Sequence, residues 1–216
     1  PALSIVVEKG IPAGAGLGGG SSDAAATLIG LYRMFPGAVD RLELLRIAEG
    51  IGSDVPFFME SACAAVSGRG ERLTPIKPRL DYALVIVDPG FPISTKDAYD
   101  RLDQARAAGR VPPATGDAAM DRELEAMVDS YERVQLAAWP FRNDFFEALV
   151  PDYPALEACK AELLASGAVF ASMSGSGSVV FGIYASSDHA EHVRASLSKR
   201  YRAYTAFPLA RLHQSI

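Results

Sequence analysis

The chain has 216 residues, of which 49% are hydrophobic and 22% are charged, and its formal net charge at pH 7 is −5. This length allows one large domain or two small ones, and the composition is typical of a soluble globular protein. The negative charge gives no general attraction to nucleic acid or to anionic membranes, so we expect neither as a partner. Because no apolar run could span a bilayer and no signal peptide is visible, we expect a cytoplasmic protein.

Residues 1–80 contain a predicted strand, a glycine-rich loop, helices and a hairpin, in that order. The β-branched run 2–7 predicts the strand, and apolar residues at helical spacing predict a helix over about 22–35. Asp40 and Glu43 form a capping box at the start of a second helix, over about 40–49. GSDVPFFM then begins a short apolar helix with proline in its first turn, and CAAVSGRGERLTPI predicts a hairpin.

Residues 81–216 mix strands, helices and a second hairpin. YALVIVDPG predicts a buried strand, and Ser94 and Asp97 stand at capping-box spacing before the helix of ISTKDAYDRL. A charged helix over about 118–138 and the helices of RNDFFEAL and YPALEACKAELLAS follow, the last ended by Gly167. AVFASMSGSGSVVFGIYA predicts two strands joined by a turn, DHAEHVRASLSKRY a helix and RAYTAFPLA a final strand. This order predicts an α+β fold with two domains, 1–80 and 81–216.

The segment 11–28, IPAGAGLGGGSSDAAATL, joins the first strand to the first helix through glycines. A helix N-terminus has unpaired N–H groups and a partial positive charge, and glycines let an anion approach the backbone, so a nucleotide triphosphate fits such a loop. Ser21 and Ser22 add hydroxyl donors. No lysine precedes Ser21, which excludes a Walker A loop, and a dinucleotide fingerprint lacks its acidic partner. The strand and helix patterns on both sides disfavour a flexible linker.

The longer string PAGAGLGGGSSDAAATL resembles the phosphate loop of the GHMP kinase superfamily, which includes galactokinase and the homoserine, mevalonate and phosphomevalonate kinases. The triple glycine 18–20 and Asp23 are similar to the branch that phosphorylates 4-diphosphocytidyl-2-C-methyl-D-erythritol on the non-mevalonate route to isoprenoids. GSDVPFF, DPGFPISTKDAY and ASMSGSGSVVFG follow in the family's order, so the resemblance spans nearly the whole chain. It implies a two-lobed GHMP-kinase fold, with an ATP-binding lobe and a ferredoxin-like substrate lobe.

The resemblance also implies a catalytic residue and a nucleotide site. In this family the aspartate of the second motif, Asp54 here, accepts the proton of the substrate hydroxyl during phosphoryl transfer. Asp54 also precedes Val-Pro and could instead cap the helix that begins there. ATP is expected with Mg²⁺, whose ligands the sequence does not identify. The residues implied for the ATP phosphates are Pro12, Ala13, Gly14, Ala15, Gly16, Leu17, Gly18, Gly19, Gly20, Ser21 and Ser22.

On the acceptor side, the resemblance places Thr95 at the erythritol part of the substrate and Tyr99 against the cytidine. Ordinary packing on a helix face is an equally good explanation of Tyr99. The third motif, whose N–H groups lie near the phosphate loop and the substrate in this family, corresponds to Ser174, Gly175, Ser176 and Gly177. Glycine and serine also favour a plain hairpin turn, so that alternative stays open.

Two strings of the family are missing. Its members open with a strand that carries Ala-Lys-x-Asn, followed by Asp-Gly-Tyr-His, and neither string occurs here. We expect that this N-terminal segment is absent and that residues 1–216 alone are inactive, because we expect no other cation, Lys9 included, to replace the lysine. The alternatives are another GHMP kinase, of the homoserine or mevalonate type, and a non-catalytic nucleotide-binding fragment. The sequence predicts no oligomeric state.

Overall fold

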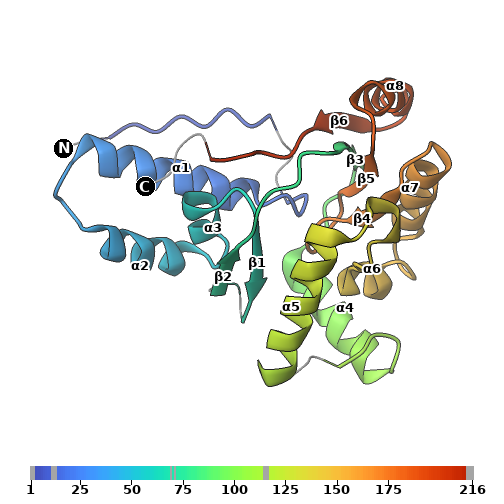
Figure 1. The fold of residues 1–216 in the computed structure, drawn as a ribbon, viewed down its shortest axis with the longest axis horizontal. Helices are drawn as coiled ribbons and strands as arrows, with labels where there is room; N and C mark the ends of the chain where they lie inside the picture. Colours follow the sequence, from blue (N-terminus) through green and yellow to red (C-terminus); the bar gives the residue numbers. More distant parts are fainter. Residues whose placement is uncertain (1–2, 11–13, 69, 71, 114–116, 213–216) are drawn as a thin grey trace.

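The computed structural model describes residues 3–10, 14–68, 70, 72–113 and 117–212. We call the first part the helical region; Figure 1 shows it on one side of the molecule. Its elements are α1 (Gly19–Met34), α2 (Arg41–Ile51), α3 (Val55–Glu60), β1 (Ala64–Ser67) and β2 (Arg72–Pro75). We call the rest the sheet region, which contains β3 (Ala83–Asp88), α4 (Thr95–Ala107), α5 (Asp117–Arg133), α6 (Asp144–Leu149), α7 (Pro154–Ala165), β4 (Phe170–Met173), β5 (Val180–Tyr184), α8 (Ser187–Leu197) and β6 (Arg202–Ala206).

In the helical region, α1 packs against α2 and α3. Ile29, Leu44 and Met59, one from each helix, are buried in the small core between them. Asp40 caps α2 as the sequence predicts, since its carboxylate accepts a hydrogen bond from the Glu43 N–H at 2.8 Å, while the Glu43 side chain pairs with Arg46. β1 and β2 pair antiparallel, which confirms the predicted hairpin.

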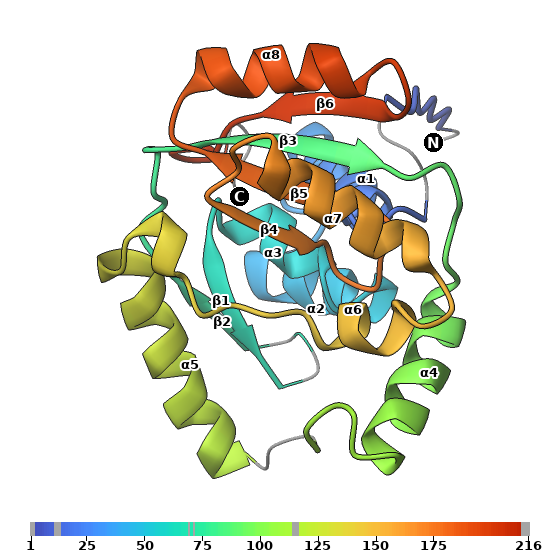
Figure 2. The ribbon, with the colours of Figure 1, turned by 90° about the vertical axis from the view of Figure 1, so that its right-hand side faces the viewer.

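In the sheet region, β3 to β6 form an antiparallel sheet in the order β4-β5-β3-β6. Helices follow β3, and α8 connects β5 to β6, so the region has the β-α-β-β-α-β order of a ferredoxin-like fold with added helices. α7 and α8 cover one face of this sheet, as Figure 2 shows. Val85 and Tyr184 of the sheet and Leu163 of α7 are buried in the core between these layers. The α+β fold that the sequence predicts is therefore confirmed.

Four details of the prediction are wrong. Residues 3–7, the described part of the predicted first strand, form no strand, and Ile5 and Val6 are exposed. A β-branched run becomes a strand only where another strand pairs with it. The first helix begins at Gly19, because Gly18 takes a left-handed N-cap conformation. The helix of 118–138 is α5 followed by a separate 3-10 turn, Leu136–Ala138, and the last strand ends at Ala206.

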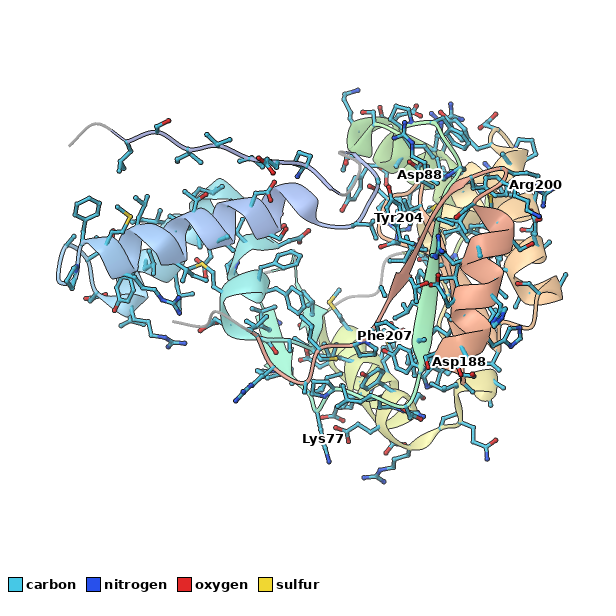
Figure 3. The ribbon with its side chains drawn as sticks, turned by 90° about the horizontal axis from the view of Figure 1, so that it is seen from above. Lys77, Asp88, Asp188, Arg200, Tyr204 and Phe207 are labelled. Carbon is cyan, nitrogen blue, oxygen red and sulfur yellow. The ribbon has the colours of Figure 1, made fainter. Side chains whose placement is uncertain are left out.

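After β6 the chain passes Phe207 and runs from the sheet back toward the helical region (Figures 1 and 3). Figure 3 also shows Asp88 and Tyr204, on β3 and β6, where the sheet faces that region. The two regions therefore lie next to each other with the glycine loop between them. In the described part of the chain, no helix is both long and apolar enough to cross a membrane.

Candidate active site

A cavity of about 650 Å³ opens where the two regions meet. This volume is in the range typical of small-molecule sites. Its walls come from the segment 3–10, the glycine loop with the start of α1, the residues just before α3, the starts of α4 and α6, and the turn between β4 and β5. The residues that line it are Lys9, Gly14, Ala15, Gly16, Leu17, Gly18, Gly19, Gly20, Ser21, Ser53, Asp54, Thr95, Tyr99, Phe145, Gly175 and Ser176.

The first turn of α1 forms the anion-binding side of this cavity. Gly18, with φ +65°, is the N-cap, and its carbonyl accepts the Ser22 N–H at 2.9 Å. The N–H groups of Gly19, Gly20 and Ser21 come before the first helical hydrogen bond and lie at the cavity wall. The partial positive charge of the helix end therefore faces the cavity. The Ser22 side chain is elsewhere: its hydroxyl donates to the Gly19 carbonyl at 2.9 Å and does not line the cavity formed by the described residues.

The glycine loop is held by the turn between β4 and β5. The Ser174 hydroxyl donates to the Gly16 carbonyl at 2.8 Å, and the Val179 N–H donates to the Ala15 carbonyl at 3.3 Å. A Cβ on Gly16 would lie 2.3 Å from the Ser174 carbonyl oxygen and 2.9 Å from that of Gly177. The backbones thus approach so closely that only glycine fits at 16. Within the third motif, Ser174 and Gly177 support the loop, whereas Gly175 and Ser176 line the cavity.

Asp54 stands at the N-cap of α3 with its carboxylate at the cavity. It is exposed and caps no N–H group in the described structure, so the geometry does not support a capping role. The Ser53 hydroxyl donates to Asp54 Oδ1 at 3.2 Å. Gly70, in the hairpin turn, lies close to this pair. A Cβ added there would lie only 2.9 Å from the Ser53 Cβ, so a larger residue would displace Ser53. The carboxylate is therefore held beside the glycine loop with an oxygen free to accept a proton. Of the other predicted site residues, Pro12 and Ala13 lie outside the described residues.

Lys9 also faces this cavity, which the sequence analysis did not expect. Its Nζ lies 2.5 Å from Asp23 Oδ2, fourteen residues away, and a Cβ on Gly19 would lie 3.4 Å from that nitrogen. The prediction dismissed Lys9 because it precedes the loop on the same extended segment. The chain instead folds back along α1, which brings the ammonium group to the start of that helix (Figure 1). A positive side chain thus lies where the helix end already favours anions.

The opposite wall of the cavity carries the predicted acceptor residues. Thr95 is the first residue of α4, and its Oγ1 lies 3.5 Å from the Ser176 hydroxyl oxygen, so the string DPGFPISTKDAY meets the third motif here. Tyr99, one turn further on, is 54% exposed. Its ring meets that of Phe145 edge to face, with centroids 4.9 Å apart. The sequence analysis predicted a helix at RNDFFEAL but assigned Phe145 no role; the residue type alone carries no signal that its ring reaches α4.

Asp97 fixes the orientation of α4 relative to the rest of the sheet region. Its carboxylate accepts hydrogen bonds from Arg101 Nε at 2.9 Å and from the Tyr153 hydroxyl at 3.2 Å. The hydrogen bond from Arg101 lowers the pKa of Asp97 below its ordinary value. Ser94, the predicted partner in a capping box, caps none of the described N–H groups. This prediction was wrong because the Asp97 side chain bonds to Tyr153, just before α7, and to Arg101 of its own helix instead.

No protein-built metal centre exists among the described residues, where no three His, Cys, Asp or Glu side chains gather closely enough to hold an ion. Mg²⁺ in nucleotide enzymes is usually held by one or two carboxylates together with phosphate oxygens and water. Phosphate oxygens of a nucleotide at the first turn of α1 and water would supply most of the ligands in such a site, with Asp54 nearby in the same cavity. The site is therefore suited to a metal ion that is bound mainly by the phosphates of a nucleotide, not by a cluster of protein side chains.

Two family models match the chain. The GHMP kinases N terminal domain matches residues 1–62, and the GHMP kinases C terminal model matches residues 132–203. The predicted boundary near residue 80 falls between the two matches and stays a prediction. The residues 14–62, with the glycine loop and Asp54, belong to the first match, and the third motif to the second.

Among curated relatives, the chain is similar to the 4-diphosphocytidyl-2-C-methyl-D-erythritol kinases of Treponema pallidum (strain Nichols) and Prosthecochloris aestuarii. It is 40% identical to the former over 199 residues, covering 92% of this chain and 68% of the relative. It is 42% identical to the latter over 203 residues, covering 93% and 68%.

Two solved structures are also similar. A crystal structure of 4-(cytidine 5'-diphospho)-2C-methyl-D-erythritol kinase is 32% identical, with a TM-score of 0.72, and the match covers 93% of this chain and 68% of that one. Homoserine kinase from Cytophaga hutchinsonii is 16% identical with a TM-score of 0.59, covering 96% and 69%, and shares the fold alone.

Proposed function

The chain belongs to the GHMP kinase family, and on that basis we propose that it transfers the terminal phosphoryl group of ATP to a hydroxyl of 4-diphosphocytidyl-2-C-methyl-D-erythritol. One observation carries the proposal. A single cavity brings together an anion-binding helix end, a carboxylate that caps nothing and an aromatic wall on α4. The two kinases to which the chain is 40% and 42% identical act, by their names, on this substrate.

The first turn of α1 supplies the phosphate side of the reaction. The N–H groups of Gly19, Gly20 and Ser21 are unpaired within the helix and can donate to phosphate oxygens. Lys9 adds a positive charge at the same end. Mg²⁺, when bound with ATP, supplies further charge neutralisation for the phosphates. Because phosphoryl transfer depends mainly on positioning and charge stabilisation, this side of the cavity provides what the chemistry needs.

Asp54 supplies the proton acceptor. As the substrate oxygen bonds to the terminal phosphorus, the bond from that phosphorus to the oxygen of ADP breaks, and the hydroxyl proton passes to the Asp54 carboxylate. The Ser53 hydroxyl bonds to Oδ1, which leaves Oδ2 for the proton. Thr95 and Tyr99, across the cavity, would hold the erythritol and the cytidine of the acceptor.

A competition assay tests the proposal in the full-length protein. The protein is incubated with ATP, Mg²⁺ and, in turn, 4-diphosphocytidyl-2-C-methyl-D-erythritol, homoserine or mevalonate, and products are identified by mass spectrometry. We expect a phosphorylated product from the cytidine substrate alone. A product from homoserine or mevalonate would contradict the proposed acceptor, and ATP binding without any product would favour the non-catalytic alternative.

A further inference from the structure

Tyr99 presents an aromatic surface to the cavity that the protein itself does not cover. Its side chain lies on α4, and the residue is 54% exposed although tyrosine is large and mostly apolar. The ring lines the same cavity as the glycine loop. A free aromatic face at a nucleotide site can stack on a base, but a side chain this exposed loses rotamer freedom when a ligand orders it. A neighbour that restrains the ring in advance would lower that cost.

Phe145 is placed to restrain Tyr99. The two rings meet edge to face at 4.9 Å between centroids, with an angle of 83° between their planes. Phe145 is half-buried and packs against the main core of the sheet region and against the smaller cluster that contains Leu102 and Val111. Its own position is therefore set by packing. Since Phe145 also lines the cavity, the two rings form one aromatic corner.

Asn143 fixes the backbone that carries Phe145. Its side-chain oxygen accepts the Phe145 N–H at 2.9 Å, and its amide group donates to the Met173 and Gly175 carbonyls at 2.8 Å each. The start of α6 is thereby tied to the turn between β4 and β5, whose Ser176 touches Thr95. The turn between β4 and β5 is thus hydrogen-bonded both to the start of α6, which carries Phe145, and to the glycine loop.

We propose that Phe145 is a positioning residue for the nucleobase of the acceptor substrate, which acts by holding Tyr99 in the orientation that stacks on the base. This inference rests on the proposed function, because the base belongs to the cytidine diphosphate part of that substrate. Phe145 sets how tightly the acceptor binds and leaves ATP binding and the chemical step unchanged. An edge-to-face pair contributes about 0.5–1.5 kcal/mol, which corresponds to about two- to tenfold in affinity.

Calorimetric titration of CDP into the full-length protein tests this role without turnover. Phe145→Leu keeps an apolar side chain but removes the ring, and it should raise the Kd for CDP about two- to tenfold. Phe145→Tyr should restore binding because it keeps the ring. Phe170→Leu is the matched control: Phe170 is a half-buried aromatic residue of β4 outside the cavity, so CDP binding should stay unchanged.

A double-mutant cycle separates this role from general packing. In the Tyr99→Leu background, Phe145→Leu should have no further effect on the Kd for CDP, because its influence passes through the Tyr99 ring. In steady-state assays, Phe145→Leu should raise the KM for the cytidine substrate at constant kcat and constant ATP KM. If thermal melting shows that Phe145→Leu does not fold, Phe145→Met takes its place in both measurements.

The outcomes distinguish this inference from the proposed function. An unchanged CDP affinity in folded Phe145→Leu, or an equal loss of ATP and CDP affinity, would overturn the inference while turnover by the parent protein upholds the kinase. If the parent protein makes no phosphorylated product but Phe145→Leu still weakens CDP binding, the kinase proposal is overturned and the role of Phe145 in base binding is upheld.

Discussion

The helical region and the sheet region differ in how much apolar surface they bury. Among the described residues, the main core of the sheet region holds 18 buried residues, whereas the core of the helical region holds six. Ile5, Val6, Met34 and Ile51 of the helical region are exposed, and its extended segment 3–10 pairs with no described strand. The sheet region, by contrast, has both a paired sheet and two covering helices. The stability of this chain is therefore expected to come mainly from the sheet region.

The chemical groups are distributed in the opposite way. The glycine loop, Lys9 and Asp54 all belong to the helical region, and the sheet region holds the loop through the hydrogen bond from Ser174 to Gly16. Catalytic loops commonly stand on a scaffold that is more stable than they are. The comparison predicts that substitutions in the two regions will separate activity from stability.

The largest effect is expected from Asp54→Asn in the full-length protein. Loss of the proton acceptor should lower kcat by roughly 10²–10⁴, with ATP affinity little changed. The melting temperature should hold, because the Asp54 carboxylate caps no described N–H group.

Leu156→Ala is the contrasting variant in the sheet region. Leu156 is fully buried in the main core, and its truncation should cost about 2–5 kcal/mol of unfolding free energy while the folded fraction keeps its kcat. Steady-state kinetics and thermal melting measure both variants. An Asp54→Asn protein that melts early but turns over normally would show that Asp54 serves the helix and not the reaction.

Gly16→Ala tests the joint between the two regions. The added methyl group would meet the Ser174 carbonyl oxygen at 2.3 Å, and φ at this position is +74°. We expect a loss of about 2–3 kcal/mol in stability together with weaker ATP binding, since the loop must move. Gly30→Ala, in the middle of α1 with no described atom within 4 Å of its Cβ, should leave ATP binding unchanged. Equal effects of the two variants on ATP binding, measured by titration, would contradict the close packing of loop and turn.

Lys9→Ala tests whether the charge at the start of α1 serves the nucleotide. The ion pair with Asp23 is partly exposed, with 36% and 40% of the two side chains accessible, so stability should change little. The Kd for ATP should rise about three- to tenfold, and the difference should shrink at high salt. Lys77→Ala, on an exposed residue that does not line this cavity, is the control. Unchanged ATP affinity in Lys9→Ala would contradict a role for Lys9 in nucleotide binding.

Local sequence patterns predicted features of both regions that depend on near neighbours in the sequence. The Asp40 cap, the stop at Gly167 and the two hairpins depend on neighbours in the sequence, and the structure confirms them. The strand at 2–7 failed because pairing is a long-range property. The start of α1 was misplaced because glycine usually weakens a helix, whereas here the left-handed Gly18 begins one.

The site was predictable only where a motif carries its own chemistry. The glycine loop and Asp54 do so, and the structure brings both to one cavity. Lys9 and Phe145 reach that cavity through chain reversals that no local pattern encodes. Ser174 was expected near the loop, but its hydrogen bond to Gly16, 158 residues away, follows only from the way the two regions meet.

The smallest effect is expected at Asp97, which anchors α4 within the sheet region. The hydrogen bond from Arg101 lowers the pKa of Asp97 in the folded protein, so the ionised form stabilises the fold. This stabilisation is present above the pKa of the unfolded chain and is lost as the pH falls through the lower pKa of the folded state. Because Asp97 is near the surface, Asp97→Asn should lower the melting temperature by only about 1–3 °C at pH 7.

The pH dependence decides whether that anchor is ionic. The difference in melting temperature between Asp97→Asn and the parent protein should narrow as the pH is lowered from 7 toward 3, because the parent carboxylate itself becomes protonated. Asp103→Asn, on an exposed residue of the same helix with no ion pair among the described residues, should show no such trend. A difference that stays constant with pH would mean that Asp97 stabilises α4 through its hydrogen bond with Tyr153 and not through its charge.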